Sequence, residues 1–280
     1  LTINGRKVTC KSGDSLLSVA EKNNIFIPSL CHHPDLKPYG ACRMCLVEDE
    51  KSGRLMAACV TPAAKDMAVQ TDTERIVNHR KNIIRLMIAE HPESCIVCAK
   101  GNRCELRGLA ARLGVAETKL YPMPNYKPYE ELNPFIVRDL SKCILCGKCI
   151  RADHELVAAG AIDYSDRGFA ARPATLMEKP LEESTCTFCG TCVSVCPTGA
   201  LSAKPAGYVG TPENQSDSVC GFCGAGCSLS MGVNAGRVVE VHPSKVKGSV
   251  NGPTLCVRGH FAHDYLNCKD RLREPALRET

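Results

Sequence analysis

The chain has 280 residues, of which 5% are aromatic and none is tryptophan, so it is long enough for several domains but can bury only small hydrophobic cores. Its net charge of +5 is modest, and no basic run is interleaved with aromatic residues, which argues against nucleic acid as a partner. No stretch reaches the roughly 18 consecutive apolar residues of a membrane span, and the first residues lack the layout of a signal peptide.

The 20 cysteines are the most informative residues of the sequence. They stand in tight C-x2-C groups, whereas disulfide partners are usually scattered along a chain. This pattern indicates metal ligands in a reducing compartment. Because the sequence also lacks a membrane span and the layout of a signal peptide, we expect a soluble, cytoplasmic protein. The first residue is Leu1 and not Met, which leaves open a trimmed N-terminus.

Residues 1–74 are predicted to form a small α+β domain with a metal site. Asn4-Gly5 lies between alternating apolar and polar residues, a hairpin signal, and a helix follows with Asp14 as candidate N-cap and a polar end at residues 23–24. Four cysteines then have the spacing C-x10-C-x2-C-x13-C, namely Cys31, Cys42, Cys45 and Cys59. This set suits a [2Fe–2S] cluster, with Gly40 allowing the backbone close to the sulfides. A structural zinc site is the alternative.

Residues 75–119 are predicted to form a helix followed by a second site. Between 75 and 90 the apolar residues fall on one helical stripe, which ends at His91-Pro92. The next segment has the spacing H-x3-C-x2-C-x5-C, given by His91, Cys95, Cys98 and Cys104. Three clustered cysteines leave one coordination position that His91 fits, so we expect a [4Fe–4S] cluster held by one histidine and three cysteines.

Residues 120–134 carry four prolines between Tyr121 and Pro134 and no periodic pattern, which predicts a linker. Residues 135–205 then contain two runs of the bacterial ferredoxin type, C-x2-C-x2-C-x3-C-P, in which the fourth residue of each run binds the other run's cluster. One predicted [4Fe–4S] site is therefore Cys143, Cys146, Cys149 and Cys196, and the other is Cys186, Cys189, Cys192 and Asp153.

Asp153 stands where the first run would have its fourth cysteine. A carboxylate is a harder ligand than a thiolate, so its iron should be easier to lose and the cluster's potential should differ. We therefore expect Asp153 as the fourth ligand of a [4Fe–4S] cluster. His154 as the ligand, a [3Fe–4S] cluster, or an Asp153 that is merely solvated are the alternatives.

Residues 216–280 are predicted to form a final domain that opens at Cys220, after a boundary at 204–218. Its cysteines have the spacing C-x2-C-x3-C-x28-C and are Cys220, Cys223, Cys227 and Cys256. A zinc ribbon could use the same four residues. Only Cys10 and Cys268 are then left over, and the default for each is a buried or ordinary thiol. The remaining histidines, including His242, His260 and His263, are read as structural or surface residues.

The motifs together resemble a known family. "PSLCHHPDLKPYGACRMCLVE", Cys59 and the group from His91 to Cys104 resemble the N-terminal region shared by the large iron–sulfur subunit of complex I, soluble hydrogenases and NAD-linked formate dehydrogenases. Residues 135–205 resemble the two-cluster insert of formate dehydrogenases and iron-only hydrogenases. Residues 218–280, with "CVRGHF", resemble the N-terminal [4Fe–4S] domain of molybdenum or tungsten bis-pterin oxidoreductases.

The resemblance implies an α+β protein with four parts: a β-grasp [2Fe–2S] ferredoxin domain, a helical histidine-ligated cluster domain, a two-cluster ferredoxin-like domain and the bis-pterin type [4Fe–4S] domain. It places Arg258 between the last cluster and a pterin. It implies one [2Fe–2S] and four [4Fe–4S] clusters, with a molybdenum or tungsten pterin in a partner chain or in a C-terminal continuation. A flavin subunit that uses NAD(P), or a ferredoxin, is the implied second partner.

The resulting prediction is an electron-transfer subunit of a formate dehydrogenase-type complex, with no catalytic residue of its own. The same role in a hydrogenase, an electron-bifurcating complex or an NADH:quinone oxidoreductase is the first alternative. A zinc-stabilised scaffold or a redox sensor is the alternative of another class. Cluster-to-cluster distances depend on how residues 120–134 fold back.

Overall fold

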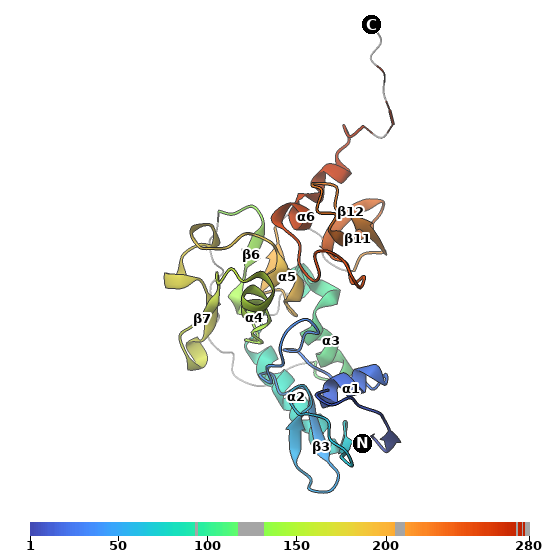
Figure 1. Cartoon of the computed structure of the whole chain (residues 1–280). Coiled ribbons are helices and arrows are strands. Elements are labelled where there is room, and N and C mark those ends of the chain that lie inside the picture. The colour runs from blue at the N-terminus through green and yellow to red at the C-terminus, as the bar shows by residue number, and fades with distance from the viewer. Residues whose placement is uncertain (93–94, 117–131, 205–210, 273, 276, 278–280) are drawn as a thin grey trace.

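The computed structural model describes residues 1–92, 95–116, 132–204, 211–272, 274–275 and 277. The N-terminal sheet and the C-terminal sheet lie at opposite ends of the molecule, and helices α4 and α5 lie between them (Figure 1). Most of the predicted linker at 120–134 lies outside the described residues. Within the described residues, no helix is long and apolar enough to cross a membrane.

The N-terminal domain is a five-stranded sheet with the strand order β2-β1-β5-β3-β4, in which β1 and β5 run parallel. The predicted hairpin is confirmed, because Asn4 and Gly5 have positive φ and Ile3 pairs with Arg6. This is the sheet and helix arrangement expected of a β-grasp ferredoxin domain. Its elements are β1 (Thr2–Ile3), β2 (Arg6–Lys7), α1 (Leu16–Lys22), β3 (Leu46–Asp49), β4 (Leu55–Ala57) and β5 (Ala68–Gln70).

Helix α1 covers this sheet with a buried apolar face. The N-cap is Ser15, whose hydroxyl accepts a hydrogen bond from the Ser18 N–H at 3.2 Å. The prediction of Asp14 as the cap was therefore wrong by one residue. The Asp14 carboxylate instead accepts hydrogen bonds from the Lys11 N–H and the Lys22 ammonium, which close the turn before the helix.

Two helices form the second domain, α2 (Glu74–Ala89) and α3 (Glu105–Arg112). Helix α2 begins at the N-cap Thr73, whose hydroxyl accepts a hydrogen bond from the Ile76 N–H, and it ends just before Pro92 as expected. Its buried stripe consists of Ile76, Arg80 and Ile84. Leu106 and Leu109 of α3 pack in the same hydrophobic cluster as Ile84.

Residues 132–204 form the third domain around two short helices that each follow a cysteine loop. The two loops have the same backbone form: Leu145 and Gly147 in one, and Phe188 and Gly190 in the other, all have positive φ. Strands β6 and β9 pair antiparallel and close the domain. The elements are β6 (Ile136–Arg138), α4 (Lys148–Ala152), a π-helical turn (Asp153–Val157), β7 (Asp163–Ser165), β8 (Arg172–Ala174), α5 (Thr191–Val195) and β9 (Leu201–Ala203).

The C-terminal domain is a three-stranded antiparallel sheet with one short helix. Its elements are β10 (Asn214–Val219), β11 (Ser228–Asn234), β12 (Arg237–Pro243) and α6 (Val257–Phe261). Strand β10 lies before Cys220, so the expectation that this domain opens at Cys220 was wrong. All six residues of β10 are exposed, and the strand therefore lacks the apolar alternation that would have identified it.

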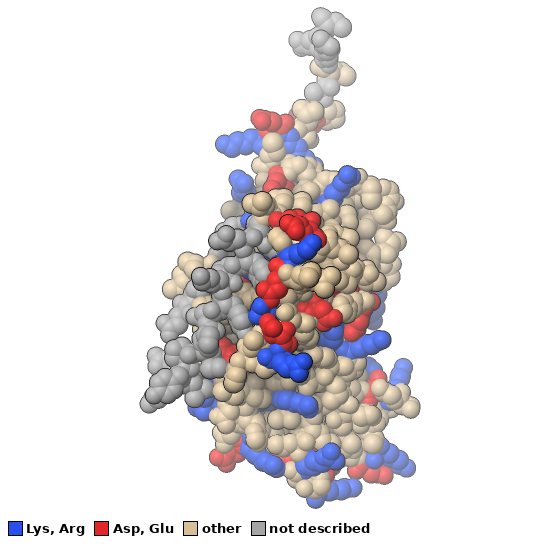
Figure 2. Space-filling model, turned by 90° about the vertical axis from the view of Figure 1, so that its left-hand side faces the viewer, with Lys and Arg blue, Asp and Glu red and all other residues tan. Residues whose placement is uncertain are grey.

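Figure 2 shows the charged side chains on one face of the molecule. On the face shown in Figure 2, Lys and Arg residues are interspersed with Asp and Glu residues, and neither sign gathers into a broad patch. The charge on this face therefore gives no strong field of one sign.

Candidate metal centres

The first cysteine set lies in the N-terminal domain, and all four of its cysteines are buried. The Cys31 thiol lies within hydrogen-bonding distance of those of Cys42 and Cys59, and the bond from Cys42 holds the pKa of Cys31 well below its usual value. The Cys59 thiol also lies within hydrogen-bonding distance of that of Cys45. Backbone amides also point at the sulfurs: the Leu30 N–H lies 3.4 Å from Cys42 Sγ, and the Cys42 N–H lies 3.5 Å from Cys31 Sγ. Amides aimed at sulfur stabilise negative charge on it.

The second set follows helix α2. Cys98 is buried, Cys104 is partly buried and Cys95 is exposed. Burial lowers the pKa of His91, so its imidazole is neutral at neutral pH, the form that binds a metal. Burial raises the pKa of Cys104, and the negative charges of Cys98 and Cys95 raise it further.

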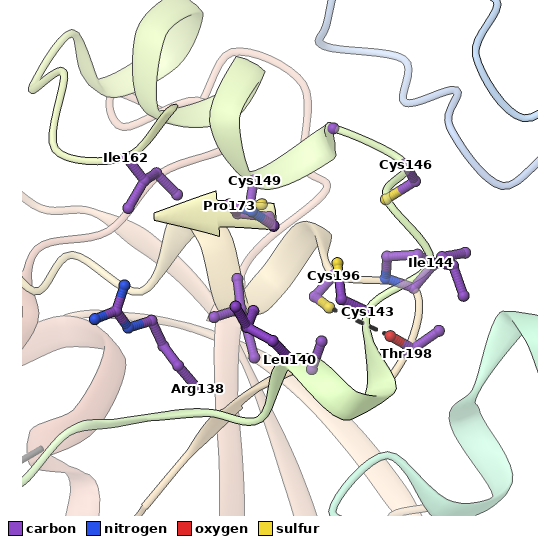
Figure 3. Close-up of a pocket in the computed structure, with 14 residues that line it drawn as sticks. Arg138, Leu140, Cys143, Ile144, Cys146, Cys149, Ile162, Pro173, Cys196 and Thr198 are labelled. Atoms are coloured by element: carbon purple, nitrogen blue, oxygen red, sulfur yellow. Dashed lines mark hydrogen bonds between the residues drawn. The ribbon is translucent and has the colours of Figure 1, made fainter. Parts of the chain in front are cut away.

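The third set is drawn in Figure 3. Cys143, Cys146 and Cys149 from the loop before α4 and from α4 itself, and Cys196 from the end of α5, line one cavity. Apolar side chains close this cavity, among them Leu140 and Ile162. Burial raises the pKa of Cys143 and Cys146 to about 12, so these thiols need a metal to remain thiolates. The structure thus brings together the four residues of the predicted crossed arrangement.

The fourth set has the matching arrangement. Cys186, Cys189 and Cys192 line a second cavity, and Asp153 lines it with them. The Phe188 N–H lies 3.4 Å from Cys186 Sγ, just as the Leu145 N–H lies 3.4 Å from Cys143 Sγ. The two loops therefore repeat one geometry, in which a residue at positive φ turns its amide toward a cysteine.

Asp153 is tied to the backbone through one carboxylate oxygen. Its Oδ2 accepts hydrogen bonds from the Ala161 N–H at 2.6 Å and the Ile162 N–H at 3.2 Å. His154, the alternative ligand, is exposed, and its Nε2 lies 3.1 Å from the Ile162 carbonyl oxygen. Of the two candidates, Asp153 is the one that lines the cavity with the cysteines.

The fifth set lies in the C-terminal domain. Cys220 and Cys227 flank the paired ends of strands β10 and β11, and Cys256 is the N-cap of α6. With Cys223 they line a cavity of about 320 Å³, to which Arg258 also contributes. Cys223 and Cys256 are exposed, so this site opens to the surface.

These donor sets fit iron–sulfur clusters. The third, fourth and fifth sets line cavities, and the volume of about 320 Å³ at the fifth is far more than a single ion would fill. In the part of the chain that the structure describes, no three His, Cys, Asp or Glu side chains are spaced to hold one metal ion. All 20 cysteines are free thiols, and the two outside the sets, Cys10 and Cys268, are exposed.

The first and third sites are joined by a clamp that the sequence did not reveal. The Arg151 guanidinium, on α4, donates hydrogen bonds to the Lys37 and Cys31 carbonyl oxygens and lies 4.9 Å from the centre of the Tyr39 ring. The Glu155 carboxylate accepts a hydrogen bond from the Lys37 N–H at 2.8 Å. Cys31 and Cys42 also share a hydrophobic cluster with Cys146.

The second and third sites also touch. Cys98 Sγ lies so close to Gly199 that a Cβ there would overlap it, and the Glu105 N–H donates to the Pro197 carbonyl oxygen at 2.9 Å. The buried Lys148 ammonium on α4 forms an ion pair with Glu105 at 3.1 Å. The third site therefore contacts both the first and the second.

Helix α6 joins the fourth and fifth sites. His260 packs on Gly190, where a Cβ would lie 2.6 Å from the imidazole Cγ, and Phe261 lies 5.5 Å from Phe135, which is itself 5.5 Å from Phe188. One residue before His260 in the helix, a Cβ at Gly259 would lie 3.7 Å from Cys220 Sγ. One helix of five residues thus contacts the surroundings of both sites.

Four family models match the chain in sequence order. They are a 2Fe-2S iron–sulfur cluster binding domain at residues 1–74, the iron–sulfur binding region of NADH-ubiquinone oxidoreductase-G at 80–119, a 4Fe-4S dicluster domain at 142–200 and the molybdopterin oxidoreductase Fe4S4 domain at 213–268. These matches and the mixed α and β structure confirm the predicted fold class.

Three curated proteins are similar in sequence. The alpha subunit of a NADPH-Fe(3+) oxidoreductase from Geobacter sulfurreducens is 37% identical over 99% of this chain and 33% of its own length. The G 2 subunit of an NADH-quinone oxidoreductase from Rhizobium meliloti is 36% identical over 99% of this chain and 33% of its own length. A NADP-reducing hydrogenase subunit of Solidesulfovibrio fructosivorans is 36% identical over 72% of this chain and 35% of its own length.

A solved structure is also similar. A chain of an NAD+-reducing [NiFe]-hydrogenase matches with a TM-score of 0.69 and 29% identity, over 75% of this chain and 88% of the other. The present chain spans about a third of the length of the curated relatives it matches. These relatives are subunits of oxidoreductases, and the more specific expectation of a formate dehydrogenase stays a prediction.

Proposed function

Because the chain consists of iron–sulfur domains of the ferredoxin-like and molybdopterin-oxidoreductase types, we propose that it is the electron-transfer part of an NAD(P)-linked oxidoreductase. The observation that carries the proposal is the gathering of thiols around separate cavities whose surroundings touch one another. When bound, each cluster supplies a centre that accepts and releases one electron.

The proposal assigns twenty ligands to one [2Fe–2S] and four [4Fe–4S] clusters. The chain's own residues hold the clusters, apolar side chains close the cavity of the third site, and amides point at sulfurs of the first, third and fourth sites, which tunes their potentials. The proposed ligands are Cys31, Cys42, Cys45 and Cys59; His91, Cys95, Cys98 and Cys104; Cys143, Cys146, Cys149 and Cys196; Cys186, Cys189, Cys192 and Asp153; and Cys220, Cys223, Cys227 and Cys256.

The contacts support a branched route in which the third site is the junction. The hydrogen bonds of Arg151 connect the first site to the third, and the close approach of Cys98 to Gly199 connects the second site to the third. Its neighbour across α4 and α5 is the fourth site, and α6 leads from there to the fifth. The order along the route therefore differs from the order along the chain.

For the host enzyme, we propose the formate dehydrogenase type in a cytoplasmic complex. A molybdenum or tungsten pterin site would lie beside the open fifth site, where Arg258 lines the cavity, and a flavin subunit serving NAD(P), or a ferredoxin, would lie at the other end. The match of residues 213–268 to the molybdopterin oxidoreductase domain supports this choice.

A hydrogenase is the second candidate host. The NAD+-reducing [NiFe]-hydrogenase chain covers 75% of this chain, which favours that enzyme class over a zinc scaffold or a redox sensor. In this host the electrons would come from a nickel–iron or iron-only centre in a partner.

The test is anaerobic purification of the native assembly from its host, with metal analysis and identification of each co-purifying chain. Molybdenum or tungsten, together with a pterin-binding chain and formate oxidation, would support the first candidate, and nickel with hydrogen oxidation would support the second. As a matched pair, Cys146→Ser should lower the iron and sulfide content, whereas Cys10→Ser, at an exposed cysteine outside the sets, should leave both unchanged. Equal iron content in the two variants would contradict the ligand assignment.

A further inference from the structure

Arg80 occupies a position where the helix pattern calls for an apolar residue. It lies between Ile76 and Ile84 on the buried stripe of α2, and only 4% of its surface is exposed. Burying a charge is costly unless the charge is compensated. A cation kept at this position therefore needs an explanation beyond packing.

The contacts of Arg80 converge on one ligand of the first site. Its Nε donates to the Met44 carbonyl oxygen at 2.9 Å, and one terminal nitrogen donates to the Leu46 carbonyl oxygen at 2.8 Å. These two residues flank Cys45, so the guanidinium bridges the backbone carbonyl groups on either side of this cysteine.

Among the described residues, no carboxylate forms an ion pair with Arg80, and Asp72 acts on its charge only from a distance. The two hydrogen-bond acceptors of Arg80 are neutral carbonyl oxygens. Burial lowers the pKa of Arg80 to about 10, which leaves the guanidinium protonated at neutral pH. The negative charge of Cys45 acts in the opposite direction, and so does that of the exposed Asp72.

We propose that Arg80 is a positioning residue that raises the reduction potential of the first site by placing a buried positive charge beside Cys45. The inference rests on the proposed function, because it requires a [2Fe–2S] cluster at Cys31, Cys42, Cys45 and Cys59.

The physical reason is the change of charge on reduction. A [2Fe–2S] cluster held by these four cysteines would take up one electron from a reductant such as dithionite, and the site would then be more negative by one charge. A fixed cation nearby stabilises the reduced state more than the oxidised state, and burial strengthens the effect. A unit charge roughly 10 Å away at an effective dielectric constant of about 20 changes the ratio of reduced to oxidised protein about tenfold.

The experiment compares three variants of the whole protein, purified anaerobically in the assembly that it forms. Arg80→Gln removes the charge, Arg80→Lys keeps it without the planar fork, and Arg85→Gln removes the charge of an exposed arginine on the same helix. Each is titrated with dithionite in the presence of mediators, and the [2Fe–2S] signal is followed by electron paramagnetic resonance (EPR).

We expect Arg80→Gln to lower the ratio of reduced to oxidised protein at a fixed potential about tenfold, and Arg80→Lys and Arg85→Gln to stay near the wild type. An unchanged potential in Arg80→Gln, or an equal fall in Arg80→Gln and Arg80→Lys, would overturn the inference and leave Arg80 with a structural role. If Arg80→Gln does not assemble, Arg80→Lys decides: a potential near the wild type supports the charge, and a fall refutes it. A wild-type protein without any [2Fe–2S] signal would instead refute the proposed function.

Discussion

Substitutions at Asp153 separate its two proposed roles at the fourth site, as a ligand to iron and as an acceptor of backbone hydrogen bonds. Its Oδ2 accepts two backbone hydrogen bonds, whereas its other oxygen is the one available to a metal. Asp153→Asn keeps an oxygen that can accept the same bonds but removes the negative charge that a ligand to iron needs. Asp153→Ala removes both, and Asp153→Cys offers a thiolate but no acceptor for the two amides.

The magnitudes follow from these two bonds. Ala161 and Ile162 are buried, so their amides lose their partner without access to water when the carboxylate is removed. A bond to a charged group contributes about 1.5–3 kcal/mol, and part of it is screened because Asp153 is only partly buried. We expect Asp153→Ala to lower the free energy of unfolding by about 2–4 kcal/mol and Asp153→Asn by about half as much.

The assay counts iron per chain and records the EPR and Mössbauer spectra of the oxidised protein. Asp153→Asn should convert the fourth site to a [3Fe–4S] cluster while the other signals persist, and Asp153→Cys should retain four irons there with a shifted potential. Asp163→Asn, at an exposed aspartate of the same domain, is the control. Unchanged spectra and potentials in both Asp153→Asn and Asp153→Cys would show that the carboxylate only caps the backbone.

Three further predictions test the contacts between domains and the buried histidines. Arg151→Gln removes the hydrogen bonds to the Lys37 and Cys31 carbonyl oxygens, so it should lower the free energy of unfolding by about 1–3 kcal/mol. It should also slow electron exchange between the first and third sites, measured by freeze-quench EPR. The control Arg167→Gln, at an exposed arginine, should change neither quantity. Gly190→Ala and Gly160→Ala both place an alanine at positive φ, which costs about 1–2 kcal/mol in each variant. Only Gly190→Ala also places a Cβ 2.6 Å from the His260 ring, so its melting temperature should fall further. An equal fall in both variants would contradict the packing of α6 on Gly190. Burial lowers the pKa of His242 to about 4 and of His260 to about 3, below the value of about 6.5 in the unfolded chain, so the unfolded state takes up protons first as the pH falls. Stability should therefore be lost from about pH 6.5 downward, by up to about 1.4 kcal/mol per histidine and pH unit, and thermal melts of His260→Leu should show a weaker pH dependence than the wild type.

The local features of the fold could be read from the sequence because they depend on neighbouring residues. The Asn4-Gly5 hairpin and the helix before His91 need only turn chemistry and a periodic apolar stripe. Strand β10 could not be found in this way, because it is held by pairing with β11 and buries none of its side chains.

The candidate ligands could also be grouped from their spacing, since a C-x2-C-x2-C loop places three sulfurs around one point. The contacts between sites could not be predicted in this way, because each depends on residues that are far apart in the chain. Arg151 and Cys31, for example, are separated by 120 positions. The sequence does place a cation, Arg80, within the apolar stripe of α2. Only the fold shows that its guanidinium reaches the carbonyl oxygens beside Cys45.

The measurement that tests the central claim most directly is a reductive titration of the anaerobically purified native assembly, followed by EPR and calibrated by its iron and acid-labile sulfide content. The account predicts iron and sulfide in nearly equal amounts, with one [2Fe–2S] signal and four [4Fe–4S] signals that appear stepwise. Zinc in place of iron, or iron without sulfide, would contradict it.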